Sequence, residues 1–466
     1  MSDRYLVIDS RVIDKTENAE IAVRPAIKDA ANPLFGEEKP WEQRFDNLYP
    51  NTLYDEEENL FKCWYSPFTV DAPAKEMSLE RRQTEKYPER PHKGTREMGV
   101  CYATSKDGIN WDKPELGLLE YDGNTKNNLV MRGPHGAGVL LDAREANPSR
   151  RYKIITGMSS SSLGIAVCFS PDGVTWSEPK MCPLINPYRV DGTHYNALWV
   201  EELGEYVGFT RLRDQREGGS ESIKKLHAAW PLRQVGRTTS LDFEKWTEAV
   251  AVFEGENENL QIYSMPVFKH GNIYLGLPVI HNQETDRAWT ELAWSPDTIE
   301  WHRVCPGSAL IPNSDFVGDY DWGCAYSAAY PVFRNEEILL YYGGSNWLHF
   351  GWRNAYLCLA RIRPDGFAGY EQISSRESGT VTTAPIEAGR NGVRISADVS
   401  DIGNVSVKLI DGSDGRRIAE SEPIVDGVTD AVVKWREGFS FDSVAGHKVR
   451  FEFSINGARL FSFVLD

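Results

Sequence analysis

A short segment that recurs along the chain restricts the possible folds more than any other feature of this sequence. It has the form Ser-x-Asp-x-x-x-Trp and covers Ser105–Trp111, Ser170–Trp176, Ser240–Trp246 and Ser295–Trp301. The serines of these copies are spaced by 65, 70 and 55 residues, and a degenerate fifth copy covers Ala360–Tyr370. Self-similarity of this kind is typical of architectures built from repeated units.

A hairpin pattern precedes each copy. The five hairpins cover residues 51–65, 138–156, 196–210, 265–278 and 330–344, where runs of β-branched and aromatic residues flank a polar turn. Each unit therefore supplies a hairpin, a third strand that ends at the repeated turn, and an edge strand. Four strands per unit and five units predict an all-β fold, a five-bladed β-propeller over residues 41–375. The alternative is a pair of β-sandwiches whose internal similarity is fortuitous.

The repeated turns are predicted to be structural. Their Asp and Ser side chains can accept hydrogen bonds from the turn backbone, and glycine or its substitute takes the tight conformation. We expect the tryptophan of each copy to wedge between blades, and we place these turns away from the ligand site.

Two further regions flank the repeats. Residues 1–40 hold one strand pattern, Tyr5–Ile8, and then irregular sequence, so we expect a lead-in that packs on the propeller. The chain becomes rich in Ser, Thr, Gly, Pro and Ala around 376–390, and two-residue alternation returns from Val393. Alternation with Asp-Gly and Asn-Gly turns predicts a small antiparallel β-sandwich over residues 385–466.

Composition restricts the partners. The formal net charge of −17 on 466 residues argues against nucleic acid and anionic membranes as partners, whereas 14 Trp and 20 Tyr offer flat faces that suit sugar rings. The seven cysteines form no Cys-x-x-Cys, so we expect no disulfide framework, no zinc or other metal site and no cofactor. Without a leader-like apolar core or a long apolar run, we expect a soluble, cytoplasmic protein, or a secreted one if a leader was removed. The oligomeric state stays open.

The expected ligand site lies at the mouth of the propeller, where the innermost strands of all blades begin. Aligning the five hairpins places polar and aromatic residues just before each first strand, and the connection from the second to the third strand adds arginines. The candidates for substrate binding are Asn47, Tyr49, Arg96, His135, His194, Gln261, Tyr263, Arg287, Asp321, Tyr326 and Arg353.

Three carboxylates at this mouth are the catalytic candidates: Asp46, Asp191 and Glu97. Cleavage of a glycosidic bond uses a carboxylate pair, because one carboxyl group donates a proton while the other attacks or activates water. Each candidate has a structural alternative. Asp46 can cap a turn, Asp191 can belong to a plain Asp-Gly turn, and Glu97 can form a rim salt bridge with Arg96 or Arg353.

One stretch carries a resemblance to a known group of enzymes. The residues from Arg44 to Tyr54, followed by Leu60–Tyr65, resemble the first hairpin of the five-bladed β-propeller glycosidases of the β-fructosidase and arabinanase group. Asn32-Pro33-Leu34 is similar to their lead-in, and the C-terminal alternating region looks like the sandwich of the β-fructosidases. The resemblance implies that Asp46 is the nucleophile or the general base.

The sequence departs from that group at its two other catalytic positions. The second-blade Asp of the group has no counterpart at the mouth, because His135 and Gly136 occupy that stretch and Asp142 lies further along the strand. The third-blade Glu of the group, its acid, is matched only by the shorter Asp191.

Together these features favour a glycoside hydrolase that acts on an oligo- or polysaccharide. A non-catalytic carbohydrate-binding propeller is the first alternative, since binding needs only aromatic and amide side chains at the mouth. A sialidase-like hydrolase is the second; it would share the Ser-Asp-Trp turns but also needs a three-arginine carboxylate clamp, for which Arg96, Arg287 and Arg353 are the candidates.

Overall fold

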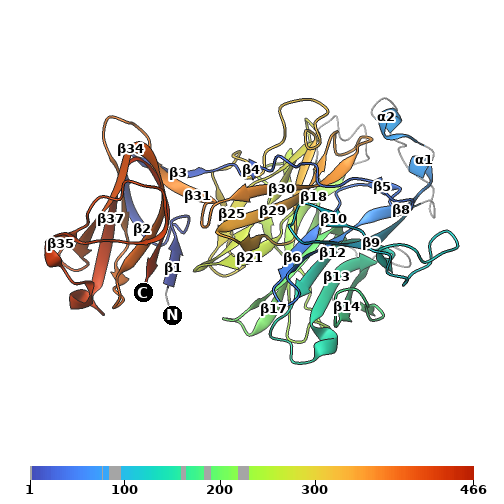
Figure 1. Cartoon of the computed structure of the whole chain (residues 1–466), viewed down its shortest axis with the longest axis horizontal. Helices are drawn as coiled ribbons and strands as arrows, with labels where there is room; N and C mark the ends of the chain where they lie inside the picture. Colours follow the sequence, from blue (N-terminus) through green and yellow to red (C-terminus); the bar gives the residue numbers. More distant parts are fainter. Residues whose placement is uncertain (1–2, 76, 83–95, 159–163, 183–189, 219–229) are drawn as a thin grey trace.

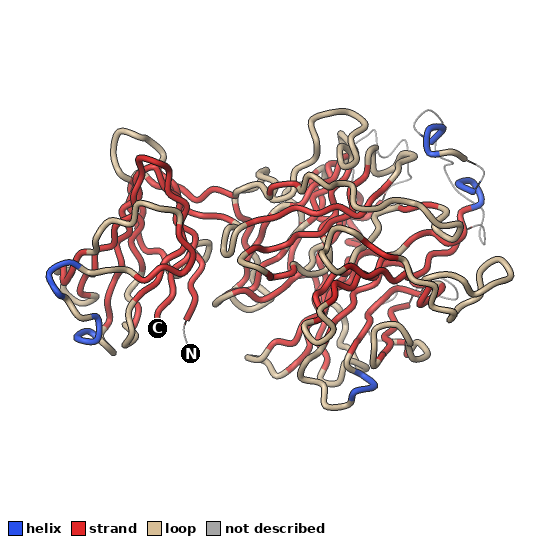
Figure 2. The backbone as a smooth tube through the Cα atoms, in the orientation of Figure 1, coloured by secondary structure: helices blue, strands red, loops and turns tan. Residues whose placement is uncertain are grey.

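The computed structural model describes residues 3–75, 77–82, 96–158, 164–182, 190–218 and 230–466, and of residues 190–193, 214–218, 230–231 and 437 only the backbone. Strands dominate this part of the chain (Figure 2), which confirms the all-β class. Helices are short: α1 (Ala72–Lys75), α2 (Leu79–Arg82) and the 3-10 turns Pro148–Arg150, Arg436–Gly438 and Phe441–Val444. No helix in the described residues is long and apolar enough to cross a membrane.

Four strands pair in antiparallel fashion in each of the first four repeat units (Figure 1). They are β6 (Asn51–Asp55), β7 (Leu60–Tyr65), β9 (Arg96–Ser105) and β10 (Trp111–Asp112); β12 (Pro134–Leu141), β13 (Tyr152–Met158), β14 (Gly164–Ser170) and β15 (Lys180–Met181); β16 (Val190–Val200), β17 (Glu205–Gly218), β18 (Trp230–Ser240) and β19 (Val250–Glu254); and β21 (Val267–His270), β22 (Ile273–Gly276), β25 (Leu292–Ser295) and β26 (His302–Val304). The predicted hairpins of these units are confirmed by the pairing of their first two strands.

The fifth unit takes its edge strand from the N-terminal lead-in. Its strands are β27 (Cys324–Ser327) and β28 (Val332–Arg334), both paired with β29 (Glu337–Ser345), then β30 (Ala355–Ile362) and β4 (Ile27–Lys28). The degenerate fifth turn therefore leads to no edge strand of this unit. Its Asp365 carboxylate is held by Arg4, His270 and Ser462, and the chain leaves for the C-terminal sheet.

The four full Ser-Asp-Trp turns have the predicted structure. In the first, Asp107 accepts hydrogen bonds from the backbone amides of Ile109 and Asn110 and from Ser105 Oγ, at 2.8–2.9 Å. The same pattern recurs at Asp172, Asp242 and Asp297.

Additional strands extend two of these sheets. Strands β5 (Arg44–Phe45), β8 (Pro67–Asp71) and β11 (Leu129–Arg132) add to the first unit through β9. Strands β20 (Leu260–Ser264), β23 (Val279–Asn282) and β24 (Arg287–Thr290) form a second ladder that joins β27 of the fifth unit in parallel, with Ala288 opposite Cys324.

The C-terminal region forms a ten-stranded sheet around two long partners, β34 (Val393–Asp411) and β37 (Lys448–Leu465). The other strands from this end of the chain are β31 (Ala368–Gln372), β32 (Gly379–Thr383), β33 (Ile386–Glu387), β35 (Arg417–Glu420) and β36 (Val428–Val432). Its apolar core includes Val407, Phe451, Phe453 and Phe463, each fully buried.

The N-terminal lead-in packs on the repeat region, as expected, but its first three strands also join the C-terminal sheet. Strands β1 (Asp3–Leu6), β2 (Ile13–Glu17) and β3 (Ala19–Val23) pair with β37, β32 and β31 of the C-terminal sheet, and only β4 and the following residues pair with β30 of the repeat region. The physical reason is that these three strands supply the main-chain partners that the edges of the C-terminal sheet would otherwise lack.

Two buried asparagines tie the inner strands of neighbouring units together. Asn51 on β6 donates to the carbonyl of Ala137 at 2.8 Å and accepts from the amide of Val139 at 2.9 Å. Asn196 on β16 likewise donates to the carbonyl of Ala329 and accepts from the amide of Val267, both at 2.9 Å. These links fix the relative positions of the strand ends that carry the candidate site.

Candidate functional site

The segment between β5 and β6 is an irregular turn and not the first part of a strand. Leu48 and Tyr49 adopt φ values of +62° and +46°, a conformation that is rare for bulky residues. The turn is held by buried packing, and a β-carbon at Gly343 would lie 2.4 Å from the carbonyl oxygen of Asn47. Because strained backbone of this kind concentrates at functional sites, the turn that presents Asp46 is a functional candidate.

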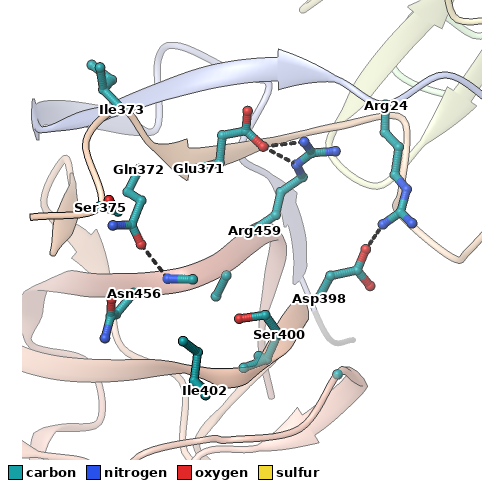
Figure 3. Close-up of a pocket in the computed structure, with 14 residues that line it drawn as sticks. Arg24, Glu371, Gln372, Ile373, Ser375, Asp398, Ser400, Ile402, Asn456 and Arg459 are labelled. Atoms are coloured by element: carbon teal, nitrogen blue, oxygen red, sulfur yellow. Dashed lines mark hydrogen bonds and ion pairs between the residues drawn. The ribbon is translucent and has the colours of Figure 1, made fainter.

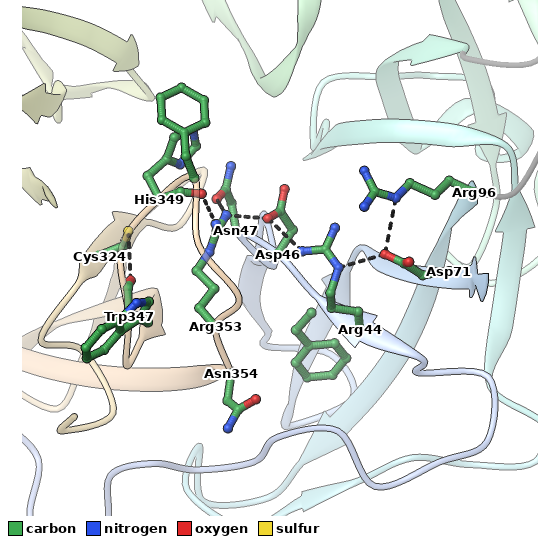
Figure 4. A network of polar contacts seen from close by, with 12 residues as sticks. Arg44, Asp46, Asn47, Asp71, Arg96, Cys324, Trp347, His349, Arg353 and Asn354 are labelled. Atoms are coloured by element: carbon green, nitrogen blue, oxygen red, sulfur yellow. Dashed lines mark hydrogen bonds and ion pairs between the residues drawn. The ribbon is translucent and has the colours of Figure 1, made fainter. Parts of the chain in front are cut away.

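Asp46 lies between two arginines at this turn (Figure 4). Arg353 forms a short ion pair with Asp46 Oδ1, and Arg44 Nη1 lies 3.1 Å from the same oxygen. Burial by itself raises the pKa of Asp46, but the charges of Arg353 and Arg44 outweigh burial and lower it to about 2. The carboxylate is therefore ionised at neutral pH. Among the described residues, nothing donates to Asp46 Oδ2.

Arg44 also connects Asp46 to a second carboxylate. Arg44 Nε donates to Asp71 Oδ2 at 2.8 Å, and Arg96 Nε lies 3.4 Å from the same oxygen. Asp71 is fully buried. It therefore orients the arginines and does not face a ligand.

Asn47 links Arg353 to two tyrosines. Its Oδ1 accepts from Arg353 Nη2 at 2.8 Å, while its Nδ2 donates to the hydroxyls of Tyr263 and Tyr49 at 2.8 and 2.9 Å. These three partners are buried. Segments that are more than 200 residues apart thus meet at one amide side chain.

Two histidines close the site on the side of the fifth unit. The hydroxyl of Tyr326 lies 2.7 Å from His349 Nδ1, and His281 Nε2 lies 2.9 Å from Asp286 Oδ1. Burial lowers the pKa of His281 to about 4, and burial followed by the charges of His281 and neighbouring arginines lowers that of His349 far below its usual range. Both rings are therefore neutral at neutral pH.

Two buried arginines lie over the ring of Tyr263. The guanidinium carbons of Arg211 and Arg233 are 4.7 and 5.2 Å from its centroid. Arg233 Nη1 also donates to Gln261 Oε1 at 3.0 Å. Two guanidinium groups therefore lie beside the Asn47–Tyr263 contact.

Most of the residues expected from the sequence meet at this site. Asp46, Asn47, Tyr49, Tyr263, Tyr326 and Arg353 are linked directly. Gln261 is linked through Arg233, and Arg96 through Asp71 and Arg44. The rings of His135 and His194 lie 6.1 and 5.7 Å from that of Tyr49. His194 is buried, and burial lowers its pKa to about 3.

Three predicted residues are engaged elsewhere. Glu97 pairs with Arg132 at 2.5 Å, because neighbouring residues on a strand point to opposite faces and Arg96 takes the face of Asp71. Arg287 donates to the carbonyls of Trp322 and Ser314. Asp321 is fully buried, and its carboxylate binds Lys28 at 2.6 Å and the Tyr342 hydroxyl at 2.8 Å.

Asp191 is placed only by its backbone, and its side chain lies outside the described residues. It belongs to β16, directly opposite Arg211 on β17. This register brings the carboxylate candidate of the third unit to the strand pair that carries the buried arginines.

Sequence reasoning missed six residues of the site: Arg44, Asp71, Arg211, Arg233, His281 and His349. Five of them lie within strands, whereas the prediction concerned the residues just before each first strand and the connections from the second to the third strand. His349 lies in such a connection, between β29 and β30, and was not singled out. The Arg44-x-Asp46 spacing was the one available signal, since residues two apart on an extended segment share a face.

A groove of about 1110 Å³ lies on the C-terminal sheet (Figure 3). Ion pairs engage its charged residues: Arg459 Nε donates to Glu371 at 2.8 Å, and Arg24 pairs with Asp398. None of the described residues that line the groove is aromatic, so it offers no ring on which a sugar can stack.

Comparisons with known proteins give similarity at the level of structure. No protein-family model matches the sequence, and no curated protein matches it. Among similar solved structures is a β-1,2-mannobiose phosphorylase from Listeria innocua bound to β-1,2-mannobiose, with a TM-score of 0.50 and 12% identity over 73% of this chain and 97% of that one. A complex of BT0996 with RGII gives a TM-score of 0.49 and 15% identity over 73% of this chain and 93% of the other protein. Similar structures include propeller-type glycoside hydrolases and phosphorylases and an N-acetylgalactosamine deacetylase, and the likeness concerns the fold alone.

Proposed function

We propose that this protein is a carbohydrate-active enzyme that cleaves a glycosidic bond at Asp46, on a five-bladed β-propeller followed by a C-terminal β-sandwich. Five units of four antiparallel strands support the architecture. The fold shared with a mannobiose phosphorylase supports the enzyme class. The observation that carries the proposal is the ionised Asp46 carboxylate on a strained turn, with Oδ2 available to a ligand.

The environment of Asp46 suits a nucleophile. A proton donor must be protonated at working pH, and a general base works best when its pKa lies near that pH. A pKa of about 2 fits neither role well. An ionised carboxylate can instead attack the anomeric carbon and form a glycosyl-enzyme intermediate. Arg44 and Arg353 hold Oδ1, which directs Oδ2 toward the substrate.

The same mechanism needs a proton donor for the leaving oxygen. His194, His281 and His349 have pKa values lowered by burial and are neutral, so none is a strong acid at neutral pH. Glu97 is held by Arg132 on the opposite face of β9. We assign the donor to Asp191, the remaining carboxylate candidate, because its strand β16 pairs with β17 close to Tyr263.

Substrate hydroxyls would be bound by groups that surround Asp46. Asp46 Oδ2 can accept from a hydroxyl, and the tyrosine hydroxyls and the half-buried His135 can donate or accept. The rings of Tyr49, Tyr263 and Tyr326 are buried, so they support the site from below and do not stack on the sugar.

The substitution Asp46→Asn tests the proposal. It keeps the shape of the side chain but removes the nucleophilic charge, so cleavage should fall by at least about 10²-fold, a lower bound because the loss of a positioned proton acceptor alone costs that much. A panel of aryl glycosides and oligosaccharides, each assayed with and without inorganic phosphate, measures the loss and shows whether water or phosphate takes the sugar. Asp414→Asn, on an exposed turn of the C-terminal sheet, is the matched control.

The outcomes separate the candidate functions. Undiminished cleavage in Asp46→Asn would remove Asp46 from the mechanism. Binding of oligosaccharides by the wild-type protein, with no cleavage of any substrate in the panel, would favour the carbohydrate-binding alternative.

A further inference from the structure

One hairpin of the fourth unit lies outside its four-strand pattern. Strands β23 and β24 stand between β22 and β25 in the chain, but they pair with each other and with β20 and β27, not with the strands of that unit. The turn of this hairpin ends at Asp286, which adopts a φ of +56°. Aspartate tolerates this region better than most residues, but glycine is the residue it favours. Because such strain persists only where surrounding contacts hold it, the partners of Asp286 indicate its role.

Asp286 holds the connection between β29 and β30 of the fifth unit. Its main-chain carbonyl accepts from the amide of His349 at 2.9 Å, and its Oδ2 accepts from the amide of Phe350 at 2.8 Å. Its Oδ1 lies 2.9 Å from Nε2 of the fully buried His281. Each of the three oxygens of Asp286 thus has a protein partner, and its side chain is only 13% exposed. The residue is therefore placed to hold the fifth unit and not to bind a ligand.

The peptide bond between His349 and Phe350 connects Asp286 to Arg353. The N–H of this peptide donates to the Asp286 carboxylate, and its C=O accepts from Arg353 Nη1 (Figure 4). The peptide is trans, so its N–H and C=O groups point in opposite directions, one toward a carboxylate and the other toward a guanidinium. Hydrogen bonds in series polarise one another, which strengthens both contacts. We refer to the His349–Phe350 peptide as the bridging peptide.

The bridging peptide supplies one of the few contacts that place Arg353. The Nη2 atom of Arg353 pairs with Asp46 and donates to Asn47 Oδ1 at 2.8 Å. Its Nε is buried and has no hydrogen-bond partner among the described residues. A shift of the bridging peptide would therefore move the guanidinium that holds Asp46 Oδ1.

We propose that Asp286 is a positioning residue that acts on Asp46 through Arg353. By holding the bridging peptide, it keeps the guanidinium where it binds Oδ1 of Asp46 and leaves Oδ2 directed toward the substrate. This inference rests on the proposed function, because it assumes that Asp46 attacks the sugar. It goes beyond that function by giving the β23–β24 hairpin a role in the reaction and by naming the main-chain bridge through which that role is exerted.

The substitution Asp286→Gly tests the inference, because glycine adopts a positive φ without strain and only the side-chain contacts are lost. A displacement of about 1 Å at a catalytic group can cost about 10²-fold in rate, so we expect kcat for cleavage to fall by about 10- to 10²-fold. The KM value should stay within about threefold of that of the wild type, since no group assigned to sugar binding is removed. Asp286→Asn keeps an oxygen acceptor and tolerates the same φ, so it should lose less activity.

Asp365 provides a matched control. It also has a positive φ, +62°, and its Oδ1 lies 2.7 Å from His270 Nε2, but its other partners, Arg4 and Ser462, lie in the N-terminal segment and the C-terminal sheet. Asp365→Gly therefore removes contacts of the same kind at a comparable backbone. It should lower stability and leave kcat and KM of the folded protein unchanged. A merely structural role of Asp286 would give that same result in Asp286→Gly.

A second measurement does not depend on activity. Arg353→Lys keeps a positive charge but lacks the planar fork that reaches both the bridging peptide and Asp46. Residues in one hydrogen-bond network have non-additive effects on stability, so Asp286→Gly should lower the folding equilibrium constant by a factor about tenfold smaller in Arg353→Lys than in the wild type. Urea unfolding of the four proteins measures this difference. Should Asp286→Gly fail to fold, Asp286→Asn takes its place in both measurements.

Three results would overturn the inference. The first is an unchanged kcat in Asp286→Gly when cleavage depends on Asp46, and the second is a raised KM with unchanged kcat, which would make Asp286 a substrate-binding residue. The third is an equal effect of Asp286→Gly on stability in the presence and absence of Arg353. All three leave the proposed function intact, since that function fails if Asp46→Asn still cleaves its substrate or if the wild type cleaves nothing in the panel. In the latter case the unfolding measurement still decides whether Asp286 acts through Arg353.

Discussion

Among the single residues of the site, charge explains the arrangement better than shape. Asp46 is held by two arginines that are almost fully buried, with exposed side-chain fractions of 3% for Arg44 and 2% for Arg353. Neither arginine can be exchanged for a neutral residue without leaving a buried carboxylate without its partner, a change that costs several kcal/mol in typical proteins. The charges of Asp46, Arg44 and Arg353 therefore stabilise one another.

This coupling predicts how stability depends on pH. The pKa of Asp46 is lowered from 3.8 to about 2 in the folded protein, so its ionisation stabilises the fold above pH 4 and the contribution is lost as pH falls toward 2. The contribution is about 2 kcal/mol at neutral pH. Urea unfolding should therefore show a stability gap between the wild type and Asp46→Asn that narrows as pH falls from 6 to 2.5. A gap that is the same at every pH would show that the arginines do not hold Asp46 ionised.

Single residues were predictable from the sequence where they stand at strand ends. Asp46, Asn47 and Tyr49 precede a strong hairpin pattern, and the rule that strand starts meet at one mouth was enough to group them with Tyr263 and Tyr326. Arg211 and Arg233 lie inside long strands, where the sequence does not show which face is turned toward the site. Glu97 and Arg287 were placed at the mouth because they lie in the connection from the second to the third strand, and the structure pairs them with neighbours away from Asp46.

Among the structural elements, the repeated turns are best understood by the burial of their tryptophans. Trp246 is 1% exposed and its indole donates to the carbonyl of Phe243 at 3.0 Å, whereas Trp111 and Trp176 are half-buried. The four copies thus share one backbone design but differ in how much apolar surface they remove from water.

The difference gives a graded prediction. Trp246→Ala should lower the free energy of unfolding by about 3–5 kcal/mol, the usual cost of truncating a buried aromatic residue. Trp176→Ala should cost less, because part of its ring already contacts solvent. Urea unfolding measures both, and substrate preference should be unchanged in the folded fraction. An altered preference at unchanged stability would mean that these turns belong to the ligand site.

Elements differ in how much signal they leave in the sequence. The hairpins and the Ser-Asp-Trp turns are long enough to show alternation and a fixed spacing, so they were predicted correctly. Strand β4 has two residues, Ile27 and Lys28, and so short a segment shows no periodicity. Its pairing with β30 depends on contacts between segments far apart in the chain and not on the local sequence pattern. The same holds for β1–β3, whose partners lie more than 340 residues away in the chain.

In the protein as a whole, one N-terminal segment belongs to both parts of the structure. Leu6 and Ile8 are buried in the core cluster that includes Phe268 and Leu275 of the repeat region. Val7, between them, is buried in the core of the C-terminal sheet. Alternating side chains of one segment thus join two hydrophobic cores.

This shared segment predicts that the two parts unfold together. Differential scanning calorimetry of the wild-type protein should show a single transition, because unfolding of either part exposes Leu6, Val7 and Ile8. Replacing Leu6 and Ile8 with alanine should cost about 2–5 kcal/mol at each site and weaken only the contact with the repeat region. The single transition should then separate into two. Cleavage of the substrate by the folded protein should persist, because Asp46 lies between β5 and β6 in the first repeat unit and not in the N-terminal segment. Val7→Ala is the matched control, because it removes one smaller apolar contact with the C-terminal sheet and leaves Leu6 and Ile8 in place, so the single transition should move to lower temperature without separating. Two independent transitions in the wild-type protein would show that the N-terminal segment does not couple the two cores.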